Sequence, residues 1–305
     1  MIRMPTAVQD LVELLRCPSC RAELRVGADI VCRSGHSFRV EDGIPILTGQ
    51  ANPSDHAQHD HQRDHFDGEY RRYKTYNLEN WQRVYVDRVA EILPAPPETG
   101  AYLDVGTGGS AYTVIEAARR GVPSVGCDIS LEGMKSARRL AAAEGVGPLC
   151  LFVVCTSEAL PFANGAFATT AAIAVLEHVP DDSAAIAEIA RVTRKGGSAF
   201  LAMPNSLDLM PWPLRWLYRR HDLRIGHLRH YQREELSERC ASAGLLTTRW
   251  AYSAHWIKAW QLLFHLAASR FRIHDNRLWW FFERIDQRAA RRKNGLHLNL
   301  WLRRT

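Results

Sequence analysis

Two acidic residues and the glycine-rich turn between them have the spacing of a nucleotide-binding βαβ unit. Apolar residues lead into Asp104, and a Gly-Thr-Gly-Gly-Ser turn follows it. Gly106 and Gly108 permit a tight turn and let a ligand approach the backbone, which a Cβ atom would block. The next apolar run ends at Asp128, about 20 residues further on, where a carboxylate can accept from both ribose hydroxyls. The alternative role for Asp128 is to cap the helix expected after Ser130.

Three cysteines and one histidine near the N-terminus have the spacing of a tetrahedral zinc site. Cys17 and Cys20 enclose a Pro-Ser turn, and Cys32 and His36 enclose Arg-Ser-Gly. Four protein ligands leave no open position, so such a zinc ion would be structural. A segment of about 35 residues buries little apolar surface, and a metal would supply the missing stability. The alternative is two unrelated pairs of residues.

The elements that position the acidic residues alternate between strand and helix. Strands are predicted at 101–105, 124–127, 149–154, 169–175 and 198–203, with helices at 110–120, 131–143 and 183–193. This alternation predicts an α/β fold with a doubly wound, mostly parallel sheet. Continuous apolar side chains in the fourth strand indicate cover on both faces of the sheet. Ligands of such sheets bind beyond the carboxyl ends of the strands, where Asp104 and Asp128 lie.

The flanking segments divide the chain into four predicted regions. These are a zinc-ribbon domain, a linker, a core with its N-terminal helices, and an acceptor-cap region with the final antiparallel strands: 1–49, 50–65, 66–205 and 206–305. The linker is polar and has few apolar anchors, so we expect a flexible hinge. Its alternative is a metal site at His56, His59, His61 and His65. Residues 245–252 and 296–302 alternate like two strands, and helical spacing between them predicts an inserted helical pair.

Five motifs, in order, resemble those of class I S-adenosylmethionine-dependent methyltransferases. They are Leu103–Gly109, Gly126–Ser130, Glu158–Phe162, Leu176–Asp181 and Arg194–Ser198. The resemblance covers roughly residues 66–250 and implies a Rossmann-like sheet of seven strands with S-adenosylmethionine as cofactor. The segment from Cys17 to Leu47 resembles zinc ribbons that precede some methyltransferases, including ribosomal-RNA guanine methyltransferases.

The resemblance assigns cofactor contacts to particular side chains. The carboxylate of Asp104 would orient the glycine-rich loop and the cofactor's ammonium group, and Ile129 would pack on the adenine. The predicted cofactor-binding set is Asp104, Gly106, Gly108, Asp128, Ile129, Thr156 and Ser157. Tyr70, Tyr73 and Tyr85 are candidates for a lid over the cofactor; their alternative role is packing against the sheet.

The sequence departs from the family pattern at three positions. Ser110 replaces the usual third glycine, Thr156 replaces an aspartate that contacts the adenine amine, and Ala168 replaces another aspartate. A threonine hydroxyl or a backbone carbonyl can accept the adenine hydrogen bond instead. A non-catalytic partner protein with this fold therefore stays as an alternative to an enzyme.

Histidines beyond two of the predicted strands are candidates for catalysis. Methyl transfer to a hydroxyl needs an aligned nucleophile and a group that accepts its proton. His178 follows the fourth strand, and His227 and His230 lie in the loop region after the fifth. Arg229, beside them, is a candidate anion clamp. A structural role is the alternative for His178, and a sulfur or nitrogen acceptor would need no base.

Composition and charge restrict the acceptor and the location. The chain has 305 residues, of which 46% are hydrophobic and 24% charged, with a net charge of +6. No stretch reaches the roughly 18 uninterrupted apolar residues that predict a transmembrane helix, and no signal-peptide pattern is present. Seven cysteines, three of them clustered, fit a reducing cytoplasm with a metal site better than a disulfide framework. We therefore expect a cytoplasmic protein.

The acceptor is expected to be a small or lipid-like molecule, methylated at oxygen. The Leu-Pro-Phe and Glu-His-Val-Pro motifs resemble those of the small-molecule branch, and nine tryptophans, concentrated after residue 80, suggest an apolar acceptor or a peripheral membrane contact. Ribosomal RNA is the second choice, because of the zinc ribbon and the basic charge. A basic surface that binds nothing explains the charge equally well.

Overall fold

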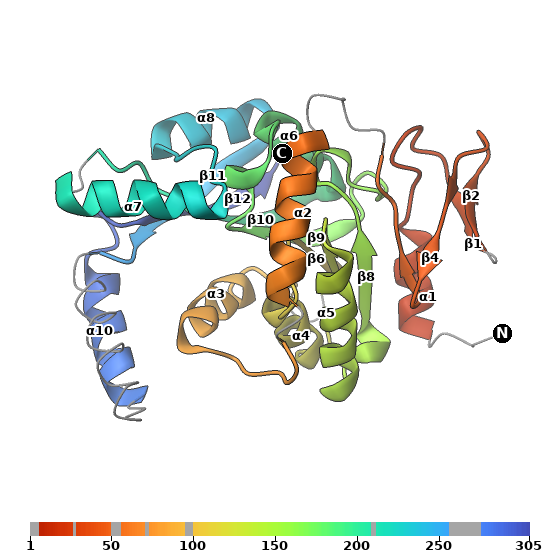
Figure 1. Cartoon of the computed structure of the whole chain (residues 1–305), viewed down its shortest axis with the longest axis horizontal. Helices are drawn as coiled ribbons and strands as arrows, with labels where there is room; N and C mark the ends of the chain where they lie inside the picture. Colours follow the sequence, from red (N-terminus) through yellow and green to blue (C-terminus); the bar gives the residue numbers. More distant parts are fainter. Residues whose placement is uncertain are drawn as a thin grey trace.

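The computed structural model describes residues 6–26, 29–49, 56–70, 73–94, 100–208, 212–255 and 276–305. A seven-stranded sheet with the order β11-β12-β10-β9-β6-β7-β8 forms its centre (Figure 1). Its strands are β6 (Ala101–Val105), β7 (Ser124–Asp128), β8 (Cys150–Val154), β9 (Phe167–Ile173), β10 (Thr193–Pro204), β11 (Leu245–Ser253) and β12 (His297–Arg304). Strand β12 is antiparallel to β10 and β11, and the pairs among β6 to β10 are parallel. The predicted mostly parallel α/β sheet and its antiparallel edge pair are confirmed.

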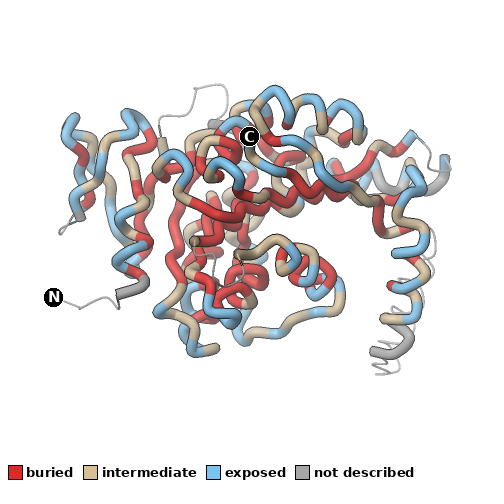
Figure 2. The backbone as a smooth tube through the Cα atoms, turned by 180° about the vertical axis from the view of Figure 1, so that it is seen from behind, coloured by how far each residue is buried: buried red, intermediate tan, exposed pale blue. Residues whose placement is uncertain are grey.

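Helices cover both faces of this sheet and enclose two apolar cores. The helices α3 (Asn80–Ala90), α4 (Tyr112–Arg119) and α5 (Leu131–Ala143) contribute to one core. On the opposite face lie α1 (Thr6–Glu13), α6 (Asp182–Val192) and α8 (Arg233–Ser242). Figure 2 shows that buried residues concentrate in the central strands. Because strands β6, β7 and β9 lie side by side, their carboxyl ends are held next to one another.

The N-terminal segment packs against the edge of the sheet. It contains a three-stranded sheet, β1 (Leu24–Val26), β2 (Ile30–Cys32) and β3 (Ser37–Phe38), and a hairpin, β4 (Val40–Glu41) and β5 (Ile44–Pro45). The Leu47 N–H donates to the Val154 carbonyl at 2.8 Å, and Ile46 forms a parallel bridge with the same residue. This contact covers β8, which would otherwise be an exposed edge strand. The predicted boundary at residue 49 stays a prediction.

The expectation of a flexible hinge over 50–65 is wrong for its described part. Helix α2 (His56–Tyr70) occupies this segment and lies across the carboxyl ends of the strands (Figure 1). Gln62 is only 4% exposed, His59 Nε2 lies 2.9 Å from Glu158 Oε1, and Asp67 accepts from the Ser130 hydroxyl. These contacts stabilise a helix that its polar composition alone does not predict, since packing overrides local propensity.

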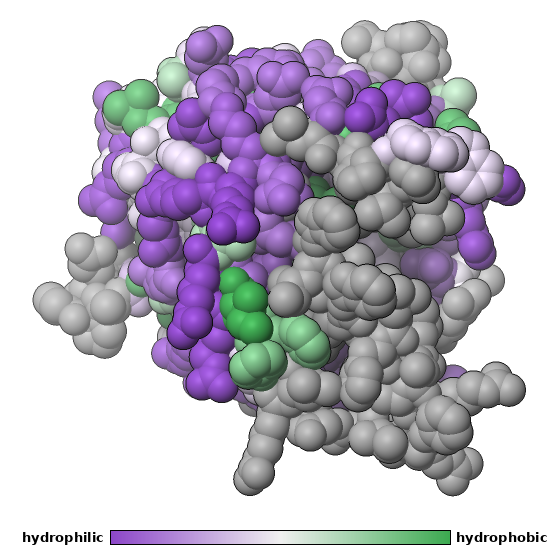
Figure 3. Space-filling view, turned by 90° about the vertical axis from the view of Figure 1, so that its left-hand side faces the viewer, coloured by the Kyte–Doolittle hydropathy of each residue, from purple (hydrophilic) through white to green (hydrophobic). Residues whose placement is uncertain are grey.

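The region after β10 is more helical than the sequence indicates. Helix α7 (Trp212–Ile225) lies in the predicted loop-rich excursion, and α10 (Asn276–Arg288) lies between β11 and β12 as the second half of the predicted helical pair. The first half of that pair, 256–264, lies outside the described residues. Figure 3 shows the side that carries α7 and α10, where hydrophilic residues cover most of the described surface. Among the helices that the structure describes, none has the length and hydropathy needed to cross a membrane.

Candidate functional site

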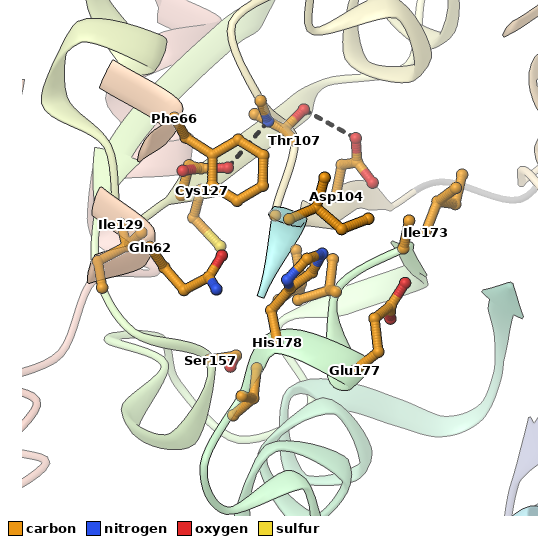
Figure 4. Close-up of a pocket in the computed structure, with 18 of the residues that line it drawn as sticks. Gln62, Phe66, Asp104, Thr107, Cys127, Ile129, Ser157, Ile173, Glu177 and His178 are labelled. Carbon is orange, nitrogen blue, oxygen red and sulfur yellow. Dashed lines mark hydrogen bonds between the residues drawn. The ribbon is translucent and has the colours of Figure 1, made fainter. Parts of the chain in front are cut away.

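A cavity of about 460 Å³ lies at the carboxyl ends of β6, β7 and β9 (Figure 4). Asp104, Asp128 and Ile173 line it from these strands, and α2 and the loops after β9 and α7 close the remaining sides. Its apolar wall surrounds polar groups at two ends. The end with the glycine-rich loop and Asp128, where cofactor contacts are predicted, is called the cofactor end, and the end with Glu177 and His178, where catalytic histidines are predicted, is called the acceptor end. These two names are used below.

The glycine-rich loop is held against β7 by its own backbone. The N–H groups of Gly106 and Thr107 both donate to the Cys127 carbonyl, at 2.8 and 3.0 Å. Gly106 and Gly108 have φ values of +69° and +62°, which L residues rarely adopt. A Cβ atom on Gly106 would also overlap the side chain of Val175. The predicted need for glycine at these two positions therefore has a backbone and a packing cause.

Asp128 is a buried carboxylate fixed by two backbone donors. Its Oδ2 accepts from the Gly108 N–H at 3.0 Å, and its Oδ1 accepts from the Ser130 N–H at 2.9 Å. The cap of α5 is Ser130 itself, whose Oγ accepts from the Gly133 N–H at 2.9 Å. Burial raises the pKa of Asp128 to about 6. Its carboxylate lines the cavity, where its remaining lone pairs are available to a ligand.

Asp104 joins the loop to the start of α4. The Thr107 hydroxyl donates to Asp104 Oδ2 at 2.7 Å (Figure 4). The Thr113 hydroxyl donates to the same oxygen. Burial raises the pKa of this carboxyl to about 6. Its position agrees with the predicted role of orienting the glycine-rich loop, and it lines the cavity.

The other predicted cofactor contacts line the same cavity. Ile129, Thr156 and Ser157 follow β7 and β8, and the turn after β8 is the 3₁₀ helix η2 (Ser157–Ala159); a second 3₁₀ helix, η1 (Gly147–Leu149), precedes β8. The Cys155 N–H donates to the Asp128 carbonyl at 3.0 Å and so holds this turn beside Asp128. Ser110 also lines the cavity, so a hydroxyl stands at the family's third-glycine position.

Helix α2 contributes six cavity residues, of which the sequence analysis assigned the first three to a hinge. They are His59, Gln62, His65, Phe66, Glu69 and Tyr70. Their spacing of three and four residues was the available signal for one face of a helix. The Phe66 ring stacks on Tyr70 at 5.5 Å between centroids and meets His178 edge-on at 5.6 Å. Helix α2 thus covers both ends of the cavity.

The three tyrosines proposed as a lid all line the cavity. Tyr70 lies against the glycine-rich loop, where a Cβ on Gly108 would be 3.0 Å from its hydroxyl and one on Gly109 would be 2.8 Å from its Cβ. Tyr85 is 9% exposed and belongs to the core, and its hydroxyl lies 3.0 Å from His297 Nδ1. Tyr70 therefore has the position of a lid, and Tyr85 both lines the cavity and packs in the core.

The acceptor end brings together two loops that are far apart in the sequence. The 3₁₀ helix η3 (Leu176–His178) follows β9, and the Leu228 N–H donates to the Glu177 carbonyl at 2.7 Å. His227 Nε2 lies 3.8 Å from Glu177 Oε1, and its ring centroid is 4.7 Å from that of His178. On the other side of the ring, His227 Nδ1 lies 2.8 Å from Asp222 Oδ1. Sequence reasoning placed Glu177 beside His178 without giving it a role, and it missed Asp222.

Burial changes the protonation of this cluster. It raises the pKa of Glu177 to about 8 and lowers that of His178 to about 3. A histidine with such a low pKa holds a proton poorly at neutral pH, which weakens the case for His178 as a general base. His227, held by a carboxylate as in a catalytic triad, is the better-placed base of the two.

His230 and Arg229 lie behind this cluster. Neither belongs to the described residues that line the cavity. His230 Nε2 lies 3.2 Å from Asp222 Oδ2, and the Arg229 guanidinium donates to the carbonyls of Val179 and Pro180 and pairs with Asp182 at 3.2 Å. Their contacts support the loop, so the structure gives no support to a base at His230 or to an anion clamp at Arg229.

The cysteine and histidine cluster forms as its spacing predicts. The ligand atoms of Cys17, Cys20, Cys32 and His36 all lie within 4.8 Å of one another. The thiol sulfurs of Cys17 and Cys32 are 3.5 and 3.3 Å from His36 Nδ1, and those of Cys20 and Cys32 are 3.7 Å apart. Tetrahedral zinc with these ligand types separates its ligand atoms by roughly 3.5–3.8 Å. The distances therefore match a zinc site, on the far side of β8 from the cavity.

Comparison with known proteins finds similarity in the central part of the chain. Residues 103–201 match a family described as "Methyltransferase domain". This stretch, about a third of the chain, is therefore similar to methyltransferase domains. The ubiquinone biosynthesis O-methyltransferase of Parvibaculum lavamentivorans is 34% identical over 110 residues, which are 36% of this chain and 42% of that protein. A ubiquinone/menaquinone biosynthesis C-methyltransferase of Bartonella tribocorum is 31% identical over 126 residues, 41% of this chain and 48% of that protein.

Solved structures share the fold of the methyltransferase domain and its flanks. Geranyl diphosphate C-methyltransferase from Streptomyces coelicolor has a TM-score of 0.57 at 16% identity, covering 84% of this chain and all of that chain. A geranyl diphosphate methyltransferase bound to geranyl diphosphate and sinefungin has a TM-score of 0.54 at 19% identity, covering 73% and 79%. At these identities the likeness shows the fold alone. The chain spans about half the length of the curated relatives it matches.

Proposed function

We propose that this protein transfers a methyl group from S-adenosylmethionine to an oxygen of a small-molecule or lipid-like acceptor. The observation that carries the proposal is that one cavity contains both the Asp128 and glycine-loop end and the histidine and carboxylate end. In this arrangement a cofactor and an acceptor meet inside one apolar enclosure. The cofactor supplies a methyl group on a sulfonium, which is displaced in line by the acceptor oxygen.

The residues of the cofactor end fit S-adenosylmethionine. Asp128 is held rigidly by two backbone N–H groups and keeps lone pairs for the two ribose hydroxyls. Ile129 supplies an apolar surface for the adenine, and the hydroxyl of Thr156 is available to its amine. Asp104, on the strand beside Asp128, supplies a carboxylate for the ammonium group. Ser110 and Thr156, which differ from the residues usual at these positions of the family, thus still supply hydrogen-bonding groups.

The walls near the acceptor end fit a molecule with an apolar body and a polar reacting group. Phe66, Ile173, Val175 and Met203 line the cavity near Glu177 and His178. Such pockets use apolar walls for affinity and a few polar groups for orientation. The names of the similar ubiquinone biosynthesis methyltransferases also favour a lipid-like acceptor. We assign the acceptor hydroxyl to the Glu177 and His227 side, where loss of its proton makes the oxygen nucleophilic.

Helix α7 supports delivery of such an acceptor from a lipid surface. Its exposed apolar residues Trp212 and Trp216 are 78% and 57% exposed, and Leu223 is 82% exposed. Arginines alternate with them along the helix, at positions 215, 219, 220 and 224. Tryptophans with nearby cations are typical of helices that lie on anionic membranes. Ile225, where α7 ends, lines the cavity, so a peripheral membrane contact would lie near its entrance.

We also propose that Cys17, Cys20, Cys32 and His36 hold a structural zinc ion. Their ligand-atom distances support a tetrahedral site, and four protein ligands leave no position for a substrate. The strands of the small sheet around it are only two or three residues long, so zinc would supply much of the stability of this sheet. Cysteine to serine replacement at Cys17 is expected to release zinc and to weaken the packing of the segment on β8.

The test of the proposed activity is transfer of labelled methyl from S-adenosylmethionine into a host lysate. The products are separated into RNA, protein, lipid and small-molecule fractions. Nuclease-resistant label in the lipid or small-molecule fraction is the expected result. Label that nuclease removes would make RNA the acceptor and reject the proposal. Absence of cofactor binding by calorimetry would instead favour the non-catalytic alternative.

A further inference from the structure

We propose that Glu177, His178 and His227 form a second metal site, which binds a divalent transition-metal ion at the acceptor end of the cavity. This site is separate from the cysteine cluster and uses different ligand types. Its residues come from η3 and from the loop after α7. Figure 4 shows Glu177 and His178 beside each other in the cavity, with Asp104 on the cofactor side of them.

The distances among the three ligands suit a metal ion after a small contraction. One ligand atom from each residue lies within 4.8 Å of the others, and Glu177 Oε1 is 3.8 Å from His227 Nε2. A metal with bonds of about 2.1 Å and tetrahedral angles separates its ligand atoms by roughly 3.4 Å. Side-chain movements of about 0.2 Å at each residue would close the difference for Glu177 and His227, and no pair among the three needs more than about 0.7 Å at each residue. The two loops already share the backbone hydrogen bond from Leu228 to Glu177.

Two buried side-chain atoms of this cluster have no hydrogen-bond partner among the described residues. Glu177 is 1% exposed, and its Oε2 has no hydrogen-bond partner within the part of the chain that the structure describes. His178 Nδ1 is likewise buried without a partner among those residues. Buried polar atoms normally have a partner, because an unsatisfied atom loses the hydrogen bonds that it makes with water in the unfolded chain. A cation between them would satisfy both atoms.

The charge of the cavity also favours a cation. Carboxylates of Glu69, Asp104, Asp128, Glu158 and Glu177 line it, whereas no lysine or arginine does so among the described lining residues. The ammonium group of the cofactor would lie near Asp104. Glu177 lies at the other end, where a positive partner would stabilise its ionised form. A bound divalent ion supplies that charge at the acceptor end.

Asp222 completes the arrangement from behind His227. Its Oδ1 lies 2.8 Å from His227 Nδ1, so the proton of the neutral ring is held on Nδ1 and the lone pair of Nε2 faces Glu177. Histidines that bind metals commonly donate their second N–H to a carboxylate in this way. The N–H groups of Gly226 and His227 both donate to the Asp222 carbonyl, at 2.8 and 3.0 Å, which fixes the ring's position. Asp222 is therefore a positioning residue.

The ligand set indicates the class of metal and its use. Two imidazoles and one carboxylate suit zinc, iron, cobalt or manganese better than magnesium or calcium. Three protein ligands leave a coordination position open toward the cavity. If the proposed methyl transfer is correct, the acceptor hydroxyl would take this position, and the metal would lower its pKa so that its proton is lost to solvent and the resulting oxyanion attacks the methyl group. His227 would then be a ligand and not the base that accepts the proton.

Cobalt titration of the full-length protein tests this site without cofactor or acceptor. Cobalt bound by thiolates has an intense charge-transfer band in the near ultraviolet, whereas cobalt bound by imidazole and carboxylate has only weaker visible bands. We expect one equivalent of each kind. Glu177→Gln and His227→Asn should weaken cobalt binding at the imidazole and carboxylate site at least tenfold, since even changes to residues behind the ligands weaken metal binding by about 10–100-fold. Cys17→Ser should remove the charge-transfer band and leave the second equivalent bound.

The matched control is His65→Asn, which changes another cavity histidine outside the cluster. It should leave both equivalents unchanged. The proposal would be overturned if cobalt bound only at the thiolate site. It would also be overturned if the second equivalent of cobalt bound with equal affinity to Glu177→Gln, His227→Asn and His65→Asn. Glu177→Gln preserves the size of the side chain, and thermal unfolding of each variant confirms that it is folded. Because cofactor binding is measured separately, a protein that binds this metal but not S-adenosylmethionine would reject only the proposed function.

Discussion

The two ends of the cavity are built from different kinds of structure. At the cofactor end, Asp104 and Asp128 lie on neighbouring parallel strands, and backbone N–H groups of Gly108 and Ser130 hold the second carboxylate. At the acceptor end, side chains from η3, α2 and the loop after α7 meet one another. The first end therefore depends on the backbone of one βαβ unit, and the second depends on the packing of three distant segments.

This difference separates what the fold requires from what can vary. A change in the cofactor end must alter a strand, a tight turn or a buried carboxylate, each of which is coupled to the sheet. The acceptor end can change through α2 or α7 while the sheet stays intact. Methyltransferases with one fold and many acceptors are expected to use this separation, because function lies in the site carried by a fold. The predictions below test whether the two ends respond separately.

The largest expected effect is at Asp128. Replacement Asp128→Asn removes the charge that two ribose hydroxyls would meet, and charged hydrogen bonds contribute about 1.5–3 kcal/mol each. We expect the affinity for S-adenosylmethionine to fall about 100-fold or more, as measured by calorimetry. The control is Asp67→Asn, which removes a nearby carboxylate supplied by α2. Equal losses in the two variants would show that local charge, and not a ribose contact, controls binding.

The cofactor end could be predicted from sequence because its residues act close to one another along the chain. The strand, turn and acid of 101–128 define their own geometry, and the structure places Gly106, Gly108 and Asp128 as the spacing indicates. The choice between ribose contact and helix cap for Asp128 needed coordinates, which show Ser130 as the cap. The clustering of Cys17, Cys20, Cys32 and His36 could be predicted for the same reason, since each pair lies on one turn.

The acceptor end could not be predicted in the same way. Glu177 and His227 are brought within 3.8 Å only by the packing of α7 and the following loop, which no local pattern specifies. The segment of α2 is polar, and its helical spacing at Gln62, Phe66 and Tyr70 was hidden by that composition. Three histidines were proposed there on position alone. The structure brings His178 and His227 together at the cavity and places His230 behind them.

A second expected effect separates backbone strain from steric overlap in the glycine-rich loop. Gly106→Ala introduces a Cβ that overlaps Val175 at a φ of +69°, so strain and overpacking should together destabilise the fold by roughly 2–4 kcal/mol. Gly121→Ala has a similar φ of +80° with no atom within 4 Å of the new Cβ, and should cost about 1–2 kcal/mol. Urea unfolding of both variants measures the difference. Equal losses would contradict a packing role for Gly106.

A third expected effect is on the pH dependence of cofactor binding. Burial raises the pKa of Asp128 to about 6, and the ribose hydroxyls need its ionised form as an acceptor. As the pH falls from 7 to 5, the ionised fraction drops about tenfold, so the dissociation constant should rise about tenfold. Asp104 also has a pKa raised to about 6 by burial, and Asp67 and Tyr70 face Asp128 from α2. Asp128→Asn should therefore flatten part of the profile; an unchanged profile would assign the titration to another group.

The smallest expected effect tests the cover that α2 provides over the acceptor end. Phe66→Ala removes a ring that contacts both Tyr70 and His178, and the wall of the cavity loses apolar area there. We expect a three- to tenfold rise in the acceptor KM, corresponding to about 1 kcal/mol of lost contact, with a smaller change in cofactor affinity. Asp64→Ala on the exposed side of the same helix is the control. If Phe66→Ala weakened cofactor and acceptor binding equally, α2 would act as a single lid, and the two ends could not vary separately.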